Sequence, residues 1–240
     1  MNIILFEEHE LSETGTVFLD RQDKRNLHLR KILHKGVGDT FEAGLLGQGR
    51  GQGCIERLEA DCSLSCSVCF DAPPPPKIPV RLAVGFVRPL QLRRILKDMA
   101  TMGVQAIDLI GTDLGEQSYR DTSLLRTGAA QAALIEGAVQ AYDTVLPSLA
   151  VYHSVDTWLL HCGHESTLIV ADTVSPSTLL SAQLTLKAPF TLAIGSERGW
   201  SSRERHSFEA AGFMRLSLGE RILRTETACV AAVTLLTALQ

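Results

Sequence analysis

Hydrophobic and polar residues alternate in several short runs within the first third of the chain. Alternation of this kind, broken by glycine and polar turns, is typical of β-strands with one buried face. The pattern predicts a small β-barrel. Its strands are Asn2–Phe6, Thr16–Leu19, Gly38–Leu46, Gln52–Leu58 and Leu64–Phe70, with a glycine-rich hairpin at Gly47–Gly53. One helix interrupts them after Asp23 as N-cap, and its predicted buried side chains are Leu27, Ile32 and Leu33.

The pattern changes to alternating strands and helices after a run of prolines. Ala72–Lys77 contains four successive prolines, which fix φ and remove amide donors, so it predicts a linker. The strands beyond it are Val80–Val87, Ala106–Ile110, Leu168–Ala171 and Phe190–Ile194, and the helices are Leu90–Met102, ending at Gly103, and Leu124–Ala141. This order predicts a mostly parallel sheet covered on both faces, with a ligand beyond the carboxyl ends of its strands. We expect two domains, 1–71 and 79–240, joined by a linker at 72–78.

Length and composition permit two domains and exclude several classes of protein. The chain has 240 residues, of which 45% are hydrophobic, enough for one large core or two smaller ones. Its apolar runs are shorter than the roughly 18 residues of a membrane span, and its first residues lack a basic signal segment, so we expect a cytoplasmic protein without a membrane anchor. The formal net charge of −4 provides no overall positive field, so RNA binding would depend on a local patch.

Six cysteines follow no pattern that indicates disulfides or a metal site. Cys66 and Cys69 form a C-x-x-C sequence, but the alternation of the strand places the two thiols on opposite faces. A zinc site needs converging ligands, and no second pair is in register with this one. We therefore expect free thiols and no bound metal.

Basic residues are concentrated around the first predicted helix. Fifteen residues that contain a single acid, Asp23, hold Arg21, Lys24, Arg25, His28, Arg30, Lys31, His34 and Lys35. A cluster of this density is either a solvated helix face or a surface that contacts phosphates. In an otherwise acidic chain it is a reasonable candidate for an RNA-binding surface.

The strand Phe190–Ile194 leads into a glycine turn that precedes another helix. Gly195 and Gly199 permit positive φ and close approach of the backbone to a ligand. Ser201 and Glu204 form the capping box of the helix. A strand, a glycine turn and a helix start can cradle a small molecule, although a G-x-x-x-G turn also occurs in many loops that bind nothing.

The C-terminal segment is predicted to be a short extended stretch, Leu216–Gly219, followed by a helix from about Thr225 to Leu239. This helix is apolar on every side, which requires burial all round and favours a subunit interface, so we expect a homodimer through it. Arg221 and Arg224 precede the helix.

The two arginines need an anionic partner near so much apolar surface. They either form structural ion pairs with Glu220 or Glu226, or they meet a carboxylate or phosphate of a ligand.

Two blocks of the sequence resemble the bacterial RsmE family. They are Ile194–Ser201 and Ser217–Ala228, with Ala211–Phe213 between them. Weaker similarity extends over Asn26–Arg30, Val37–Asp39, the proline linker, Arg88–Pro89 and Met102–Val104. Members of that family are SPOUT-superfamily methyltransferases that use S-adenosylmethionine to methylate N3 of a uridine in small-subunit (16S) ribosomal RNA.

The resemblance implies an α/β fold in which a PUA-like β-barrel precedes a SPOUT methyltransferase domain with a deep trefoil knot. The family works as a homodimer on ribosomal RNA or the small ribosomal subunit and binds S-adenosylmethionine among the knot loops. The implied cofactor residues are Ala171, Ile194, Gly195, Glu197, Gly199, Ser217, Leu218, Gly219, Ile222 and Leu223. The candidate RNA contacts are Arg21, Arg25, His28, Arg30, Lys31, Arg88 and Arg94.

Methylation at N3 of uridine requires loss of the imide proton, and a cation beside O2 or O4 stabilises the forming imidate. Arg221 and Arg224 are the candidates for that cation. Glu197 and Glu226 are the carboxylates that could orient the arginines or accept the proton, and the sequence does not rank them.

Three alternatives remain open at this point. The chain could methylate another base or a ribose hydroxyl, it could be an RNA-binding relative without catalysis, or it could be an unrelated nucleotide-binding protein. The lack of a G-x-x-x-x-G-K-[ST] sequence argues against the last of these.

The chain departs from the family pattern in three places. Ser196 and Arg198 stand in the glycine loop where the family has proline and glycine, so Arg198 would be strained if that position requires positive φ. Tyr142 stands where arginine is usual. The segment Gly115–Tyr119 replaces a more basic loop.

Overall fold

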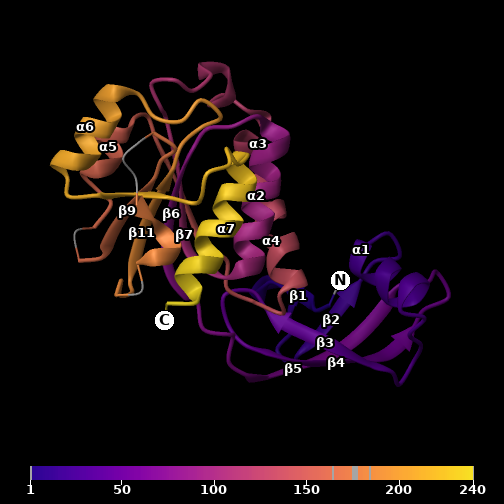
Figure 1. The fold of residues 1–240 in the computed structure, drawn as a ribbon. Coiled ribbons are helices and arrows are strands. Elements are labelled where there is room, and N and C mark those ends of the chain that lie inside the picture. The colour runs from indigo at the N-terminus through magenta and orange to yellow at the C-terminus, as the bar shows by residue number, and fades with distance from the viewer. Residues whose placement is uncertain (1, 164, 175–177, 184, 240) are drawn as a thin grey trace. The chain divides into compact units, whose positions relative to one another are not determined.

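The structure is a computed structural model that describes residues 2–163, 165–174, 178–183 and 185–239. The chain divides into two compact units (Figure 1). The first unit consists of Met1–Pro76 together with Ala138–Leu146, and the second of Lys77–Gly137 together with Pro147–Gln240.

The first unit is built on a five-stranded sheet in the order β1-β3-β4-β5-β2. The strands are β1 (Ile4–Phe6), β2 (Thr16–Leu19), β3 (Thr40–Leu45), β4 (Arg50–Leu58) and β5 (Leu64–Ala72). β1 and β3 pair in parallel, and the other pairs are antiparallel. The five predicted strands are confirmed, with ends that differ by a few residues.

The alternation of β5 separates its two cysteines as predicted. Cys66 is fully buried in the core with Phe41, Ile55 and Leu64, whereas Cys69 is exposed. Burial raises the pKa of the Cys66 thiol to about 11, so the thiol is neutral at physiological pH.

The predicted buried face of the first helix is wrong. Asp23 caps α1 (Lys24–Leu27) as expected, but the helix continues into a π turn at His28–Ile32. A π turn widens the helix and shifts the register of the side chains that follow. Leu29 is consequently buried, while Ile32 and Leu33 are 65% and 41% exposed.

Asn26 is the second buried residue of this helix, and its role is polar. Its Nδ2 group lies 3.0 Å from the carbonyl oxygens of Leu19 and Asp20 and 3.1 Å from that of Cys62. A buried carboxamide that satisfies backbone carbonyls is not visible in a hydrophobic pattern, which is why the prediction assigned the core to apolar residues alone.

A segment from the middle of the chain completes the first unit. The Nδ2 group of Asn2 donates to the carbonyl oxygen of Gln140 at 2.8 Å. Thr144 accepts from the amide of Gly47 at 2.7 Å, and its hydroxyl donates to the carbonyl of Gln48 at 2.7 Å. The sequence alone did not predict that 138–146 belongs with the N-terminal strands.

The second unit is built on a seven-stranded sheet in the order β10-β12-β9-β11-β6-β7-β8. The strands are β6 (Ile78–Gly85), β7 (Val104–Ile110), β8 (Ser148–Tyr152), β9 (Thr167–Ala171), β10 (Thr178–Leu179), β11 (Phe190–Ile194) and β12 (Met214–Ser217). Every neighbouring pair is parallel, which confirms the predicted parallel sheet. β8 and β10 were missed because both lie at sheet edges, where hydrophobic patterns are weak.

Helices cover both faces of this sheet, as Figure 1 shows. They are α2 (Pro89–Met102), α3 (Ser123–Arg126), α4 (Ala129–Gln140), α5 (Val155–Leu159), α6 (Ser202–Ala210) and α7 (Thr225–Thr237). Short 3-10 helices lie at η1 (Glu8–Glu10), η3 (Gln117–Tyr119) and η4 (Leu180–Ala182). Gly103 ends α2 with a φ of +77°, as predicted. The predicted helix Leu124–Ala141 is two helices, because Gly128 adopts a φ of +76° between them.

The C-terminal helix α7 packs beside α2 with one face only (Figure 1). Its buried side chains are Thr225, Ala228, Cys229, Ala232, Val233 and Leu236. The opposite face exposes Thr227, Val230 and Thr234 to solvent in the single chain. None of the helices in the described ranges is long and apolar enough to cross a membrane.

Candidate functional site

Loops at the carboxyl ends of β9, β11 and β12 surround a cavity of about 280 Å³, near the lower end of the roughly 300–1,000 Å³ of small-molecule sites. The start of α7 closes it. The lining residues are Ala171, Asp172, Thr173, Val174, Ile194, Gly195, Ser196, Glu197, Arg198, Gly199, Trp200, Arg205, Leu218, Gly219, Arg221, Ile222, Leu223, Thr225 and Ala228. The position agrees with the expectation that a parallel sheet binds its ligand at this edge.

The glycine loop is a tight turn that only small residues allow. The amide of Gly199 donates to the carbonyl of Ser196 at 2.9 Å, and Gly199 has a φ of +69°. A Cβ atom on Gly195 would lie 3.0 Å from the Cα of Gly199. A Cβ atom on Gly85, at the end of β6, would lie 2.5 Å from the amide nitrogen of Ser196.

Arg198 carries no backbone strain in this turn. Among the described residues, those other than glycine with positive φ are His34, Cys62 and Tyr142, so the strain considered for Arg198 is absent. The turn places its positive φ on Gly199, and Arg198 adds a side chain without a change of backbone geometry. Tyr142, the second departure from the family pattern, does adopt a φ of +58°.

Hydrogen bonds hold the glycine loop to its surroundings. The indole Nε1 of buried Trp200 donates to the carbonyl of Ala171 at 2.9 Å, which joins the loops after β9 and β11. The hydroxyl of Thr225 donates to the carbonyl of Gly195 at 3.5 Å, which joins α7 to the same loop. Ser196 is 5% exposed, and its hydroxyl lies 3.2 Å from that of Thr112.

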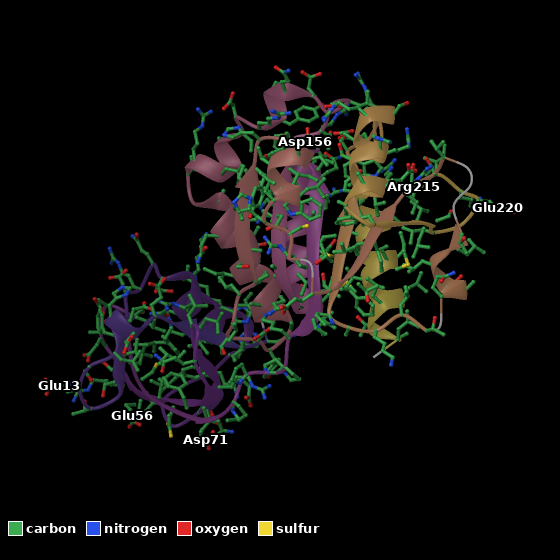
Figure 2. All side chains as sticks on the ribbon, turned by 90° about the vertical axis from the view of Figure 1, so that its left-hand side faces the viewer. Glu13, Glu56, Asp71, Asp156, Arg215 and Glu220 are labelled. Atoms are coloured by element: carbon green, nitrogen blue, oxygen red, sulfur yellow. The ribbon has the colours of Figure 1, made fainter. Side chains whose placement is uncertain are left out.

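A buried carboxylate anchors the loop after β9. Asp172 is 6% exposed, and its Oδ2 lies 2.7 Å from Nε of Arg205 and 3.3 Å from Nε of Arg215, the residue that Figure 2 labels. Burial opposes ionisation of this carboxyl, but the hydrogen bonds from Arg205 and the backbone and the two guanidinium charges outweigh it and lower its pKa. Asp172 is therefore a carboxylate at neutral pH and fixes one wall of the cavity.

A second, more polar cavity of about 570 Å³ adjoins the first. Its lining residues are Arg88, Gln91, Leu114, Glu116, Tyr119, Ser196, Glu197, Arg198, Ile222, Leu223, Arg224, Thr225 and Glu226. The two cavities share the glycine loop and the start of α7. A molecule in one would therefore lie next to a molecule in the other.

The predicted arginines divide between the two cavities. Arg221 lines the first, Arg224 lines the second, and Arg198 lines both. Within the described part of the chain, no ion pair or hydrogen bond engages their guanidinium groups, so the alternative of structural pairs with Glu220 or Glu226 is not observed. Three cations without protein partners thus border the two cavities.

The two predicted carboxylates also lie at the second cavity. Glu226 is half-buried at the start of α7. Glu197 is exposed, and its Oε1 accepts from the amide of Arg88 at 3.2 Å at the start of α2. The Nε of Arg88 in turn donates to the hydroxyl of Tyr119 at 3.2 Å.

The structure brings together nearly all residues that the resemblance assigned to the cofactor. Each of them lines the first cavity except Ser217. The hydroxyl of Ser217 instead bonds to the amide and carbonyl of Gly219, at 3.2 and 3.0 Å, and holds the turn after β12. The resemblance includes Asp172 in a cofactor loop and Trp200 in the matching block. The ion pairs of Asp172 with Arg205 and Arg215 were missed, because contacts between distant segments leave no local signal in the sequence.

The candidate RNA residues lie in different surroundings. Arg25 is engaged within the first unit by Glu10 and Asp23, at 2.6 and 2.7 Å. Arg30 donates from Nε to the side chain of Asn26 at 2.7 Å.

Arg21 and Lys31 are exposed, and His28 is half-buried. Arg88 lines the second cavity, whereas Arg94 is exposed on α2 and lines neither cavity. Among the described residues, no group of three or more His, Cys, Asp or Glu side chains could hold a metal ion.

Asp172→Asn is expected to destabilise the second unit in a pH-dependent manner. Because the pKa of Asp172 is lower in the folded state, its stabilisation is present above the ordinary value of 3.8 and is lost as pH falls through the lowered folded-state value. At pH 7 the loss should be about 1.5–3 kcal/mol, as for hydrogen bonds to charged groups. Urea titration followed by tryptophan fluorescence measures it, because Trp158 and Trp200 both lie in this unit.

Asp121→Asn serves as the control for this experiment. Asp121 is exposed, so its replacement should change the free energy of unfolding by less than about 0.5 kcal/mol. A difference between wild type and Asp172→Asn that persists unchanged down to pH 3 would contradict the ionised state of Asp172.

Comparison with known proteins identifies the family. A family model described as an RNA methyltransferase domain matches residues 74–237. The ribosomal RNA small subunit methyltransferase E of Treponema pallidum (strain Nichols) is 37% identical over 97% of this chain and 89% of that protein. The ribosomal RNA small subunit methyltransferase E 1 of Borreliella burgdorferi is 29% identical over 97% of this chain and 95% of that protein.

A solved structure agrees with the fold. The crystal structure of a ribosomal RNA small subunit methyltransferase E from Neisseria gonorrhoeae, bound to S-adenosyl methionine, has a TM-score of 0.77 at 21% identity and covers 98% of this chain and 97% of that chain. The resemblance to the RsmE family is confirmed. The chain belongs to the ribosomal RNA small subunit methyltransferase E family of RNA methyltransferases.

Proposed function

We propose that the chain transfers the methyl group of S-adenosylmethionine to N3 of a uridine in small-subunit (16S) ribosomal RNA. The main support is the pair of adjoining cavities. The first is lined largely by backbone and glycine, and the second is polar and bordered by Arg224. Membership of the family supports both the cofactor and the RNA substrate.

The first cavity has the chemistry that the cofactor requires. Backbone groups of the three loops can bond to an adenine edge, and the side chains of Ile194, Ile222 and Leu223 offer apolar surface. Arg221 can pair with the carboxylate of the methionine moiety. When bound, S-adenosylmethionine supplies an electrophilic methyl group on a positively charged sulfur.

The second cavity can prepare the base for attack. N3 of uridine carries a proton, and its lone pair becomes available only when that proton leaves. Glu226 or Glu197 accepts the proton, directly or through water. Arg224 stabilises the negative charge that spreads over O2 and O4. Fixing the base against the glycine loop provides several kcal/mol through positioning alone.

We also propose a finer description of the fold. The second unit carries a deep trefoil knot of the SPOUT type within the methyltransferase domain 79–240. This is supported by the convergence of the loops after β9, β11 and β12 on one cavity. Residues 1–71, which form most of the first unit, are a PUA-like barrel domain that binds RNA, and 72–78 is its linker.

Two further proposals concern the assembly and the location of the protein. We propose a homodimer through α7, supported by its exposed, uncharged face at Thr227, Val230 and Thr234. Because the substrate is ribosomal RNA, we place the protein in the cytoplasm.

Deletion of the gene should abolish one methylated uridine in small-subunit ribosomal RNA. Mass spectrometry of nucleosides from purified 16S RNA measures N3-methyluridine, and the gene restored on a plasmid is the control. Loss of a different methylated nucleoside would show another target base or a ribose. An unchanged set of nucleosides would contradict the proposed reaction.

Arg221→Ala and Arg224→Ala are expected to affect different steps because they line different cavities. Arg221→Ala should weaken binding of S-adenosylmethionine about tenfold or more, the loss of one charged hydrogen bond. Arg224→Ala should lower kcat at least about 100-fold, as for loss of a donor to a developing oxyanion, and leave cofactor affinity within about twofold. Isothermal calorimetry and single-turnover methyl transfer measure the two effects.

Each arginine variant is the control for the other. Equal effects of both variants on cofactor affinity would contradict the division of the arginines between the cavities. Turnover of Arg224→Ala at the wild-type rate would refute its role in the reaction.

Replacement of Arg30 and Lys31 with Ala tests the basic surface of the first unit. If both side chains contact phosphates, the slope of log K against log salt should fall in magnitude by about 1.4–1.8, the release of two counterions. Filter binding of 16S RNA at several salt concentrations measures the slope. The control is Arg57→Ala with Lys187→Ala, which removes the same charge elsewhere on the chain. An equal change of the salt slope in that control would contradict RNA binding by the basic surface.

A further inference from the structure

The second cavity contains one side chain suited to stacking. Among its described lining residues, Tyr119 is the single aromatic one. It lies at the end of η3, in the loop where the chain departs from the more basic sequence of its family. Neither the proposed proton transfer nor the proposed cation uses it.

Tyr119 is held at its tip rather than through its ring. The side chain is half-buried, and its hydroxyl accepts from Nε of Arg88 at 3.2 Å. Arg88 precedes α2 and is tied through its amide to Glu197 of the glycine loop. These contacts fix the position of the phenol relative to the loop that both cavities share.

The cavity also contains an unused hydrogen-bond acceptor. Gln91 lines it, and the carboxamide Oε1 of Gln91 is buried with no hydrogen-bond partner among the described residues. A buried acceptor without a partner is unfavourable, because it has lost its hydrogen bond to water. This cost would be relieved by a donor that enters beside the side chain.

The chemistry of N3 requires a base that has left its stack. N3 lies on the Watson–Crick edge, which pairing and stacking hide, so an enzyme acting there must take an extruded or unpaired nucleotide. Unstacking the base is unfavourable. An aromatic side chain offsets this cost because every base presents a π-face to stack upon.

We propose that the second cavity receives a single pyrimidine nucleotide turned out of its RNA stack, and that its base stacks on the ring of Tyr119. This proposal rests on the proposed function, since the base must reach the methyl group through this cavity. Tyr119 binds the substrate and takes no part in the transfer of protons.

Three substitutions separate stacking from the hydrogen bond to Arg88. Tyr119→Ala removes the ring and the bond, Tyr119→Phe removes only the bond, and Tyr119→Trp keeps an aromatic face. The assay is transfer of labelled methyl from S-adenosylmethionine to small ribosomal subunits from a strain that lacks the gene. Leu160→Ala, which removes an exposed aliphatic side chain that lines neither cavity, is the control.

Stacking predicts a split between the variants. Tyr119→Ala should lower kcat/KM for subunits about 5- to 150-fold, the range for loss of one base–aromatic contact. Tyr119→Phe and Tyr119→Trp should stay within about threefold of wild type, as should Leu160→Ala. Calorimetry should find equal affinity for S-adenosylmethionine in all variants. Wild-type activity of Tyr119→Ala, or an equal loss in Tyr119→Phe, would overturn the proposal.

Binding of a fluorescent oligouridylate distinguishes failure of this proposal from failure of the proposed function. If the wild-type protein binds S-adenosylmethionine but methylates no subunit, the proposed function is wrong. The stacking proposal is then decided by anisotropy alone. Affinity that falls in Tyr119→Ala but not in Tyr119→Phe supports stacking, and equal affinity in both overturns it.

Discussion

The close contact of backbone with backbone in the glycine loop is the constraint on which the site depends. Gly195 can approach Gly199 because neither residue carries a Cβ atom, and Gly85 allows β6 to end against the same turn. The turn then lies within reach of Trp200 and Thr225, which bind the loop after β9 and the start of α7 to it. A larger residue at 195 would push apart elements that must converge to form both cavities.

Convergence at this turn explains how one loop borders two cavities. The first cavity takes its character from backbone and small residues, with Asp172 and its arginines holding the outer wall. The second takes its character from side chains that extend from α2, η3 and the start of α7. Binding and reaction are therefore separable by mutation, since a change in the second cavity leaves the backbone cradle of the first intact.

The sequence was informative where structure is local and uninformative where it is not. The spacing of residues in the sequence predicted three features that the structure contains. They are the capping box of Ser201 and Glu204, the end of α2 at Gly103 and the parallel sheet. The prediction of buried side chains after His28 was wrong because a π turn depends on packing that the hydrophobic pattern does not encode. The ion pairs of Asp172 join residues more than thirty positions apart, which is farther than any local sequence pattern extends.

Two of the three departures of this chain from the family pattern, the glycine loop and the segment Gly115–Tyr119, border the second cavity, and Tyr142 does not. Arg198 has negative φ, so the backbone of the turn keeps the geometry that a glycine there would allow, and the difference is one free guanidinium at the border of the two cavities. Tyr119 lines the second cavity and not the first. A cation at position 198 and an aromatic residue at position 119 add side chains to the second cavity and leave the backbone of the first unchanged. Under the proposed function, the chain differs from the family pattern in the side chains that would meet RNA and not in the backbone that would hold the methyl donor.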